Sequence, residues 1–246
     1  MPPTAPNPSC AVILAAGMGS RLRADRPKGM IELGGGPLLG RSLGLLREAG
    51  VEEIVLVAGW RQDIYREYLE ENFPAVRVLE NPAFARTGSL ASLLIGARAT
   101  VGNVLVVESD LLYEKRALSR LFAAPGRDTL LASGYTRSGD EVWVYAHDRR
   151  LARLSKQAWG GAPRCGELVG LTCLSRPALD GLLAVAPALP VGAHYEDGLN
   201  AISAAHRIDV CLVDDLQWCE IDTQEHLQRA REQVWPRIQM LDRNRH

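Results

Sequence analysis

Residues 11–31 read Ala-Val-Ile-Leu-Ala-Ala-Gly-Met-Gly-Ser-Arg-Leu-Arg-Ala-Asp-Arg-Pro-Lys-Gly-Met-Ile. The opening apolar run, ended by a bend at Gly17 and Gly19, predicts a buried strand followed by a tight turn. Glycine lets backbone N–H groups come close to an anion, and Arg21 and Lys28 then supply donors suited to phosphate oxygens. The stretch therefore predicts a polyphosphate site at the end of the first strand.

Two common phosphate motifs do not fit this bend. The dinucleotide fingerprint requires a third glycine where the chain has Leu22. The Walker motif requires lysine followed by serine or threonine, whereas Lys28 is followed by Gly29. An ordinary strand and turn with surface cations is the structural alternative to a phosphate site, because glycine turns are common.

The composition is typical of a globular protein of one large α/β domain or two small ones, with 246 residues, 47% of them hydrophobic. The net charge of −1 provides no basic field, so neither nucleic acid nor an anionic membrane is an expected partner. The five cysteines lack CxxC spacing and are expected to be reduced thiols. With no signal peptide and no apolar segment of bilayer length, the expected location is the cytoplasm.

Apolar runs alternate with amphipathic segments in the first half of the chain. Strands are predicted at residues 30–33, 53–59, 76–80 and 104–112, and helices at about 38–50 and 62–72. Strands that alternate with helices indicate a parallel α/β sheet, in which ligands bind at the carboxyl ends of the strands.

After about residue 129 the pattern changes to shorter extended segments. Antiparallel strands with a hairpin are predicted within 130–156, followed by a strand at 167–174, a helix at 177–185, a helix after Tyr195, a strand at 210–213 and a last helix after Thr223. The predicted organisation is a disordered tail (1–9), a single domain (10–235) with a lid insertion at about 130–165, and a C-terminal tail (236–246).

Two acidic residues far apart in the sequence each follow an apolar strand. Asp110 ends the 104–112 segment, with Glu108 as a supporting acid, and Asp222 follows a late apolar segment. A carboxylate at such a position can hold Mg²⁺ against a polyphosphate, and Mg²⁺ needs only one or two of them. Helix capping is the alternative role for both aspartates.

Gly88 and Ser89 follow a loop that begins at Asn81 and precede an apolar helical segment. Free N–H groups at a helix N-terminus suit recognition of a base or ribose. A plain N-cap explains the same pair equally well.

The run from Leu14 to Lys28 matches the pattern Leu-Ala-Ala-Gly-x-Gly-x-Arg-Leu…Pro-Lys and resembles the nucleotidyltransferase signature. Further matching pieces lie at 57–60, 81, 88–93, 108–110, 155–156, 166–170, 195–197 and 218–222. Over about residues 10–230 the chain resembles cytidylyltransferases of the phosphocholine and 2-aminoethylphosphonate (phosphonate) type. The resemblance implies an α/β, Rossmann-like domain with a mixed, mostly parallel central sheet flanked by helices and a small antiparallel lid subdomain.

The resemblance also implies transfer of CMP from CTP to a phosphonyl or phosphoryl oxygen of a small acceptor, with Mg²⁺ as cofactor and pyrophosphate as leaving group. The implied catalytic residues are Arg21, Lys28 and Lys156, and the implied metal ligands are Asp110 and Asp222. The implied nucleotide-binding residues are Leu14, Ala15, Ala16, Gly17, Gly19, Ser20, Gly59, Gly88, Ser89 and Ser92.

The far end of the acceptor is predicted from charge. Acidic residues that would meet an ammonium, as in 2-aminoethylphosphonate, are Glu141, Glu196, Asp197 and Glu220. Arg137 and Arg164 would instead receive a carboxylate, as in a phosphonoformate-like acceptor. Relatives that bind choline carry an aromatic residue where this chain has Glu141, which favours a phosphonate over phosphocholine.

Two other functions are compatible with the sequence: a sugar-1-phosphate nucleotidyltransferase that uses another NTP, and a nucleotide-sensing subunit without catalysis. Intact Arg21, Lys28, Asp110 and Asp222 argue against the second. The sequence contains no indication of oligomeric state.

Overall fold

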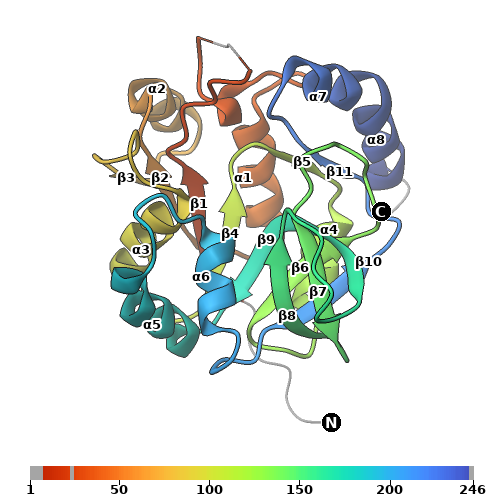
Figure 1. Ribbon diagram of the computed structural model, residues 1–246. Coiled ribbons are helices and arrows are strands. Elements are labelled where there is room, and N and C mark those ends of the chain that lie inside the picture. Colours follow the sequence, from red (N-terminus) through yellow and green to blue (C-terminus); the bar gives the residue numbers. More distant parts are fainter. Residues whose placement is uncertain (1–7, 23–24, 244–246) are drawn as a thin grey trace.

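The computed structural model describes residues 8–22 and 25–243, with a mixed sheet at its centre (Figure 1). Within the described residues the strand order is β3-β2-β1-β4-β9-β6-β10-β8-β7. The strands are β1 (Cys10–Ala15), β2 (Glu53–Ala58), β3 (Arg77–Glu80), β4 (Val104–Glu108), β6 (Thr129–Ser133), β7 (Trp143–His147), β8 (Arg150–Ser155), β9 (Arg164–Leu174) and β10 (Asp209–Val213). β1 to β4 are parallel, whereas β9 runs antiparallel to β4 and β6. The predicted Rossmann-like sheet is confirmed.

Helices cover both faces of the sheet (Figure 1). Alternation along β1 sends Ile13 into the core on one face and Val12 into the core on the other. The first core is covered by α1 (Leu38–Glu48), α2 (Gln62–Asn72) and α4 (Arg116–Phe122), and the second by α3 (Ser89–Ala99), α5 (Arg176–Val185) and α6 (Tyr195–Ile202). Because the central strands are buried on both faces, their sequences are continuous apolar runs.

Two of the predicted strands differ in the structure. The strand predicted at 30–33 is instead a 3₁₀ turn, Lys28–Met30, followed by a single bridge between Glu32 and Pro37. The segment 104–112 is two strands, because the chain turns after Glu108 and β5 (Leu111–Tyr113) pairs with β11 (Trp218–Glu220) instead of the main sheet.

The antiparallel hairpin predicted within 130–156 is present as β7 and β8. Both strands are hydrogen-bonded to the main sheet, and β6 lies inside that sheet, so 130–165 is not a separate body. The use of this region as a lid stays a prediction. All five cysteines are free thiols. No helix within 8–22 and 25–243 combines the length and apolar character needed to cross a membrane.

Of the two predicted tails, the C-terminal one is wrong, and the N-terminal one lies mostly outside the described residues. Residues 1–7 and 244–246 lie outside the described residues, but the Ser9 carbonyl accepts hydrogen bonds from the amides of Glu52 and Glu53. At the other end, α7 (Gln224–Arg229) continues through a π-helical turn (Ala230–Val234) into α8 (Trp235–Arg243). Ile238 of α8 is fully buried in a third apolar cluster. A helix therefore stands where a C-terminal tail was predicted.

Replacing Ile238 with alanine is expected to lower the free energy of unfolding by about 2–5 kcal/mol, because it leaves a cavity beneath α8. The measurement is urea-induced unfolding followed by circular dichroism. Met240→Ala on the same helix is the control, because that side chain is 59% exposed and should change the midpoint little. Equal midpoints for Ile238→Ala and the unchanged protein would show that α8 contributes nothing to stability.

Candidate active site

A polar cavity of about 300 Å³ lies at the carboxyl ends of β1 and β4. It is lined by residues from both halves of the chain. The predicted site residues that line it are Leu14, Ala16, Gly17, Gly19, Arg21, Lys28, Gly88, Ser89, Ser92, Asp110, Glu141, Lys156, Glu196, Glu220 and Asp222. This is the edge of the sheet where parallel α/β proteins bind ligands.

Four predicted residues do not line the cavity. Ala15 points from β1 into the core on the face opposite Leu14, and Ser20 lies exposed in the turn. Gly59 serves packing, because a Cβ atom there would lie 2.5 Å from Cβ of Phe84. Phe84 itself lines the cavity and was not predicted.

Asp197, the fourth of these, caps a helix. Its Oδ2 accepts a hydrogen bond from the His194 N–H at 2.9 Å, as part of a capping box at the start of α6. Of the Glu196-Asp197 pair, only Glu196 lines the cavity. The two acids diverge because consecutive helical residues point in different directions.

Lys28 occupies the centre of the charged wall of the cavity. The 3₁₀ turn directs its Nζ between two carboxylates: it lies 2.7 Å from Oδ2 of Asp110 and is also paired with Oδ1 of Asp222. Burial favours loss of the proton, but the two carboxylates outweigh it and raise the pKa of Lys28 above its usual value. The lysine is therefore a fixed cation that joins the two acids predicted to hold the metal.

Arg21 extends the same network toward solvent. Its Nη2 donates to Oδ2 of Asp222 at 2.8 Å, and its Nη1 donates to Oδ2 of Asp140 at 2.6 Å. Lys156 donates to the other oxygen of Asp140 at 2.7 Å. The cations Arg21, Lys28 and Lys156 thus lie in one chain of ion pairs, as the predicted phosphate site requires. Asp140 is not among the predicted site residues, because the pair Gly139-Asp140 by itself indicates only a turn.

The small β5–β11 sheet explains why distant acids meet. Glu220 is paired with Leu111, and the amide of Ile221 donates to the Asp110 carbonyl at 3.1 Å. This pairing places Glu220 and Asp222 on either side of Asp110. Helix capping does not explain the aspartates: a strand follows Asp110, and the cap of α7 is Thr223, whose Oγ1 accepts from the His226 N–H at 3.2 Å.

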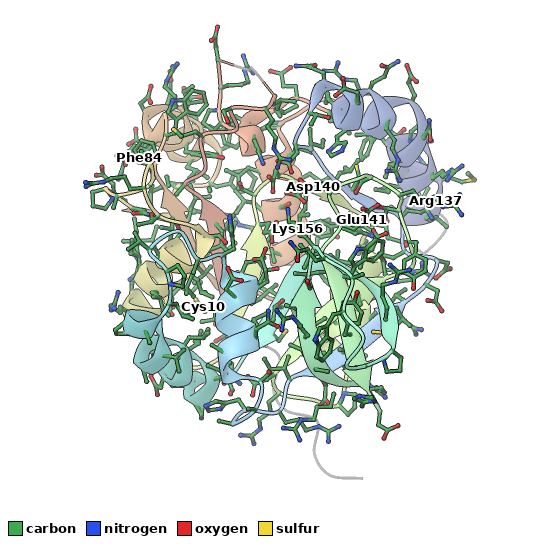
Figure 2. All side chains as sticks on the ribbon, in the orientation of Figure 1. Cys10, Phe84, Arg137, Asp140, Glu141 and Lys156 are labelled. Atoms are coloured by element: carbon green, nitrogen blue, oxygen red, sulfur yellow. The ribbon has the colours of Figure 1, made fainter. Side chains whose placement is uncertain are left out.

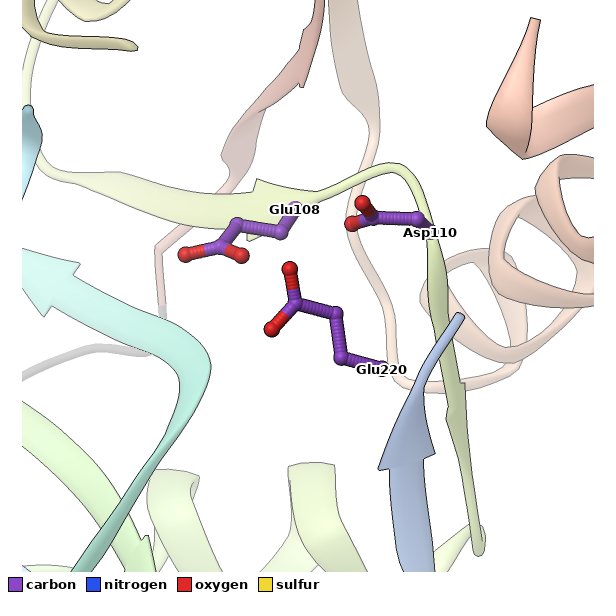
Figure 3. Close-up of side chains that lie close together, drawn as sticks. All are labelled: Glu108, Asp110 and Glu220. Atoms are coloured by element: carbon purple, nitrogen blue, oxygen red, sulfur yellow. The ribbon is translucent and has the colours of Figure 1, made fainter. Parts of the chain in front are cut away.

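Glu108, Asp110 and Glu220 form an acidic cluster whose carboxylate groups point toward one another (Figure 3). One ligand oxygen from each lies within 4.8 Å of the others. Burial and the charge of Asp110 raise the pKa of Glu108 to about 8 and raise the pKa of Glu220 well above its usual value. Carboxylates so arranged favour a bound cation, and three hard oxygen donors fit Mg²⁺ or an ammonium group.

Gly88 and Ser89, at the start of α3, also line the cavity. A side chain at Gly88 would collide with the Ala193 carbonyl, and Ser89 Oγ accepts a hydrogen bond from the Tyr195 N–H at 3.0 Å. Ser89 therefore does not cap its own helix, so the N-cap explanation is wrong for its hydroxyl. Ser92, one turn later, accepts from Nδ2 of Asn81 at 3.1 Å.

The arginines proposed for a carboxylate acceptor lie elsewhere. Neither Arg137 nor Arg164 lines the cavity in the described part of the chain. The Arg164 guanidinium lies over the rings of Trp143, 4.3 Å from the centroid, and Tyr135, at 5.0 Å. These two arginines therefore do not lie where they could receive a carboxylate acceptor bound in the cavity.

Comparison with known proteins places this geometry in a family. Residues 11–189 match the MobA-like NTP transferase domain. The CMP-5'-(3-aminopropyl)phosphonate synthase of Streptomyces rubellomurinus is 31% identical over 236 residues, covering 87% of this chain and 37% of that protein. The 2-aminoethylphosphonate cytidylyltransferase of Lancefieldella rimae is 30% identical over 174 residues, covering 68% of this chain and 67% of that protein.

A solved structure shows the same fold. The inositol-1-phosphate CTP transferase of T. maritima superposes with a TM-score of 0.80 at 18% identity, covering 94% of this chain and 96% of that one. The chain spans from 37% to about half of the length of several curated relatives. Since the family match extends over well more than half of the chain and includes the glycine bend, the protein belongs to the MobA-like NTP transferase domain family.

Proposed function

We propose that the protein transfers CMP from CTP to a phosphonyl or phosphoryl oxygen of a small acceptor that carries an ammonium group. The names of the two relatives support a cytidylyl donor and an aminoalkylphosphonate acceptor. The cavity supports the charge distribution of such substrates, because cations line one part and a cluster of acids another. 2-Aminoethylphosphonate is the acceptor that we favour.

The observation that carries the proposal is that two cation positions share Asp110. One lies between Asp110 and Asp222, where the Lys28 ammonium stands, and the other lies among Glu108, Asp110 and Glu220. The reaction has two cations to place beside the phosphates, Mg²⁺ and the acceptor ammonium. We assign Mg²⁺ to Asp110 and Asp222, which would exchange the Lys28 ammonium for the metal as Lys28 turns to the phosphates. We assign the acceptor ammonium to the glutamates, with Glu196 beside them.

The acceptor oxygen is already anionic near neutral pH, so its attack on the α-phosphorus needs no general base. A phosphorus–oxygen bond forms to the acceptor as the bond to pyrophosphate breaks. Lys28 and Arg21 would offset the charge that develops on pyrophosphate, and Lys156 would reduce repulsion between the two anions. Mg²⁺ held by Asp110 and Asp222 would add positive charge at the phosphates. Gly17, Gly19 and the start of α3 would orient the nucleotide.

The test is pyrophosphate release measured with each of the four NTPs, Mg²⁺, and a panel of acceptors. The panel contains 2-aminoethylphosphonate, phosphocholine, phosphonoformate and a sugar 1-phosphate, with ethylphosphonate as the matched acceptor without an ammonium. We expect release with CTP and 2-aminoethylphosphonate, at a KM at least about tenfold below that for ethylphosphonate. Release only with a sugar phosphate and another NTP, or CTP binding without turnover on any acceptor, would contradict the proposal.

Glu220→Gln is expected to raise the KM for 2-aminoethylphosphonate by about 10- to 100-fold, because it removes a carboxylate from the acidic cluster assigned to the ammonium. The KM for ethylphosphonate and the Mg²⁺ requirement should change little. Glu71→Gln, at an exposed position of α2, is the matched control. An equal loss with both acceptors would show that Glu220 does not recognise the ammonium.

A further inference from the structure

Asp140 lies between two of the cations that the proposed reaction uses. Its Oδ2 accepts from Nη1 of Arg21 at 2.6 Å, and its Oδ1 accepts from Nζ of Lys156 at 2.7 Å. Figure 2 shows Asp140 and Lys156 close together near the middle of the molecule. A carboxylate bridging two cations through its two oxygens presents the same kind of contact as a phosphoryl or phosphonyl group.

The two terminal nitrogens of the Arg21 guanidinium differ in their surroundings. Nη2 is held by Asp222, whose side chain is 2% exposed, whereas Asp140, on Nη1, is 22% exposed. The Lys156 side chain is 56% exposed. The buried Asp222 therefore holds the guanidinium in place. The partly exposed Asp140 can be replaced on Arg21 and Lys156 by water or by a dissolved anion.

The backbone on either side of Asp140 is held in place. The Ser138 carbonyl lies 3.3 Å from Nε2 of His226, and the Val142 carbonyl accepts from the Leu168 N–H at 2.9 Å. Release of both cations therefore requires only rotation of the Asp140 side chain. A ligand oxygen could replace the carboxylate without rearrangement of the loop.

We propose that the Asp140 carboxylate is a resident anion that occupies the phosphoryl position between Arg21 and Lys156 until a phosphate or phosphonate ligand displaces it. Asp140 thereby weakens the binding of every anion at this position by the same factor, so anions of low affinity, such as free carboxylates or sulfates, occupy it little. This inference rests on the proposed function, because that function assigns Arg21 and Lys156 to phosphate groups.

The charge state of Asp140 supports displacement. Burial alone would raise its pKa, but hydrogen bonds and charge from Lys156 and Arg21 outweigh burial and lower the pKa to about 2. Asp140 is thus a full monoanion at neutral pH, whereas a phosphate monoester carries a charge between about −1.5 and −2. The ligand with the greater charge gains more from the two cations.

The experiment measures binding of two probes of similar shape, ethyl phosphate and ethyl sulfate, by calorimetry without CTP. Asp140→Asn is compared with Glu225→Gln, which removes one negative charge from an exposed residue in the first turn of α7 that does not line the cavity. Asp140→Ser serves as a second variant, and circular dichroism verifies that each variant is folded.

Displacement predicts a specific pattern. Both probes must displace the same carboxylate, so Asp140→Asn should tighten the binding of both by the same factor, about tenfold. Glu225→Gln should leave the binding of both nearly unchanged. If Asp140 acted only by long-range repulsion, Asp140→Asn would tighten the two probes unequally. The gain in affinity for ethyl phosphate, a dianion, would be about the square of the gain for ethyl sulfate, a monoanion. Such unequal gains would overturn the inference. Equal effects of the two variants, or weaker or undetectable binding of ethyl phosphate by Asp140→Asn, would also overturn it.

The outcome is separable from that of the proposed function. If Asp140→Asn binds the two probes more tightly but the protein turns over CTP with no acceptor, the role of Asp140 is supported and the proposed reaction is contradicted. If the protein turns over CTP but Asp140→Asn binds the probes no more tightly, the proposed reaction is supported and the role of Asp140 is contradicted.

Discussion

Lys28→Ala is expected to lower the rate of pyrophosphate release by about 10³-fold at saturating CTP and acceptor. Lys28 is the cation joined to both Asp110 and Asp222, in a site that is largely shielded from water. A fixed charge in such surroundings stabilises developing negative charge far more than a solvated one. Steady-state pyrophosphate release, with the acceptor found best in the screen, is the measurement.

The same substitution tests the structural role of Lys28. Removing the ammonium leaves Asp110 and Asp222 facing each other without their cation, which should cost about 3–5 kcal/mol of unfolding free energy. Mg²⁺ should restore part of this stability, because it supplies positive charge at the same place. Lys115→Ala is the control, since Lys115 forms an exposed ion pair with Glu48. A folded Lys28→Ala protein with unchanged turnover would remove Lys28 from the mechanism.

Asp110→Asn is expected to lower turnover by about 10²- to 10³-fold and to raise the Mg²⁺ concentration needed for half-maximal rate. Asp110 takes part in both cation positions, and asparagine keeps its shape while removing its charge. A second readout is thermal unfolding. Mg²⁺ with CTP should raise the Tm of the unchanged protein, and this shift should shrink in the variant.

Comparison of variants separates the two cation positions. Asp222→Asn should behave like Asp110→Asn, whereas Glu220→Gln should retain the Mg²⁺ requirement. Asp63→Asn is the control, because that side chain lies on the surface of α2, 67% exposed, beside Arg61. An unchanged Mg²⁺ requirement in Asp110→Asn would contradict the assignment of the metal to Asp110. If Glu220→Gln raised the Mg²⁺ requirement and Asp222→Asn did not, the metal would be assigned to the glutamates instead.

Local sequence determined the first strand and the bend after it. The apolar run of β1, Gly17, Gly19 and Lys28 behind Pro27 all act within a few residues, so their pattern could be interpreted without knowing the rest of the chain. The alternation of strands and helices likewise determined the parallel core and the edge of the sheet where the cavity lies.

Tertiary contacts decided two features of the fold that the pattern of apolar residues does not predict. The 104–112 run reads as one strand, but the Ser109 N–H donates to the Leu14 carbonyl and the Asp110 carbonyl accepts from Ile221, so the chain turns there. Burial of Ile238 similarly converts a predicted tail into a helix. These interactions link residues that are far apart in sequence, and periodicity in a short window does not contain them.

The candidate site divides in the same way. Residue chemistry predicted phosphate and metal roles for Arg21, Lys28 and the two aspartates, and the structure joins these side chains in one network of ion pairs. Asp140 could be found only from the fold, because nothing in a Gly-Asp turn indicates which cations it will meet. The sequence by itself determined which charges the site possesses. The pairing of β5 with β11 and the course of the Asp140 loop decided which of them touch, because hydrogen bonds between distant segments set their distances.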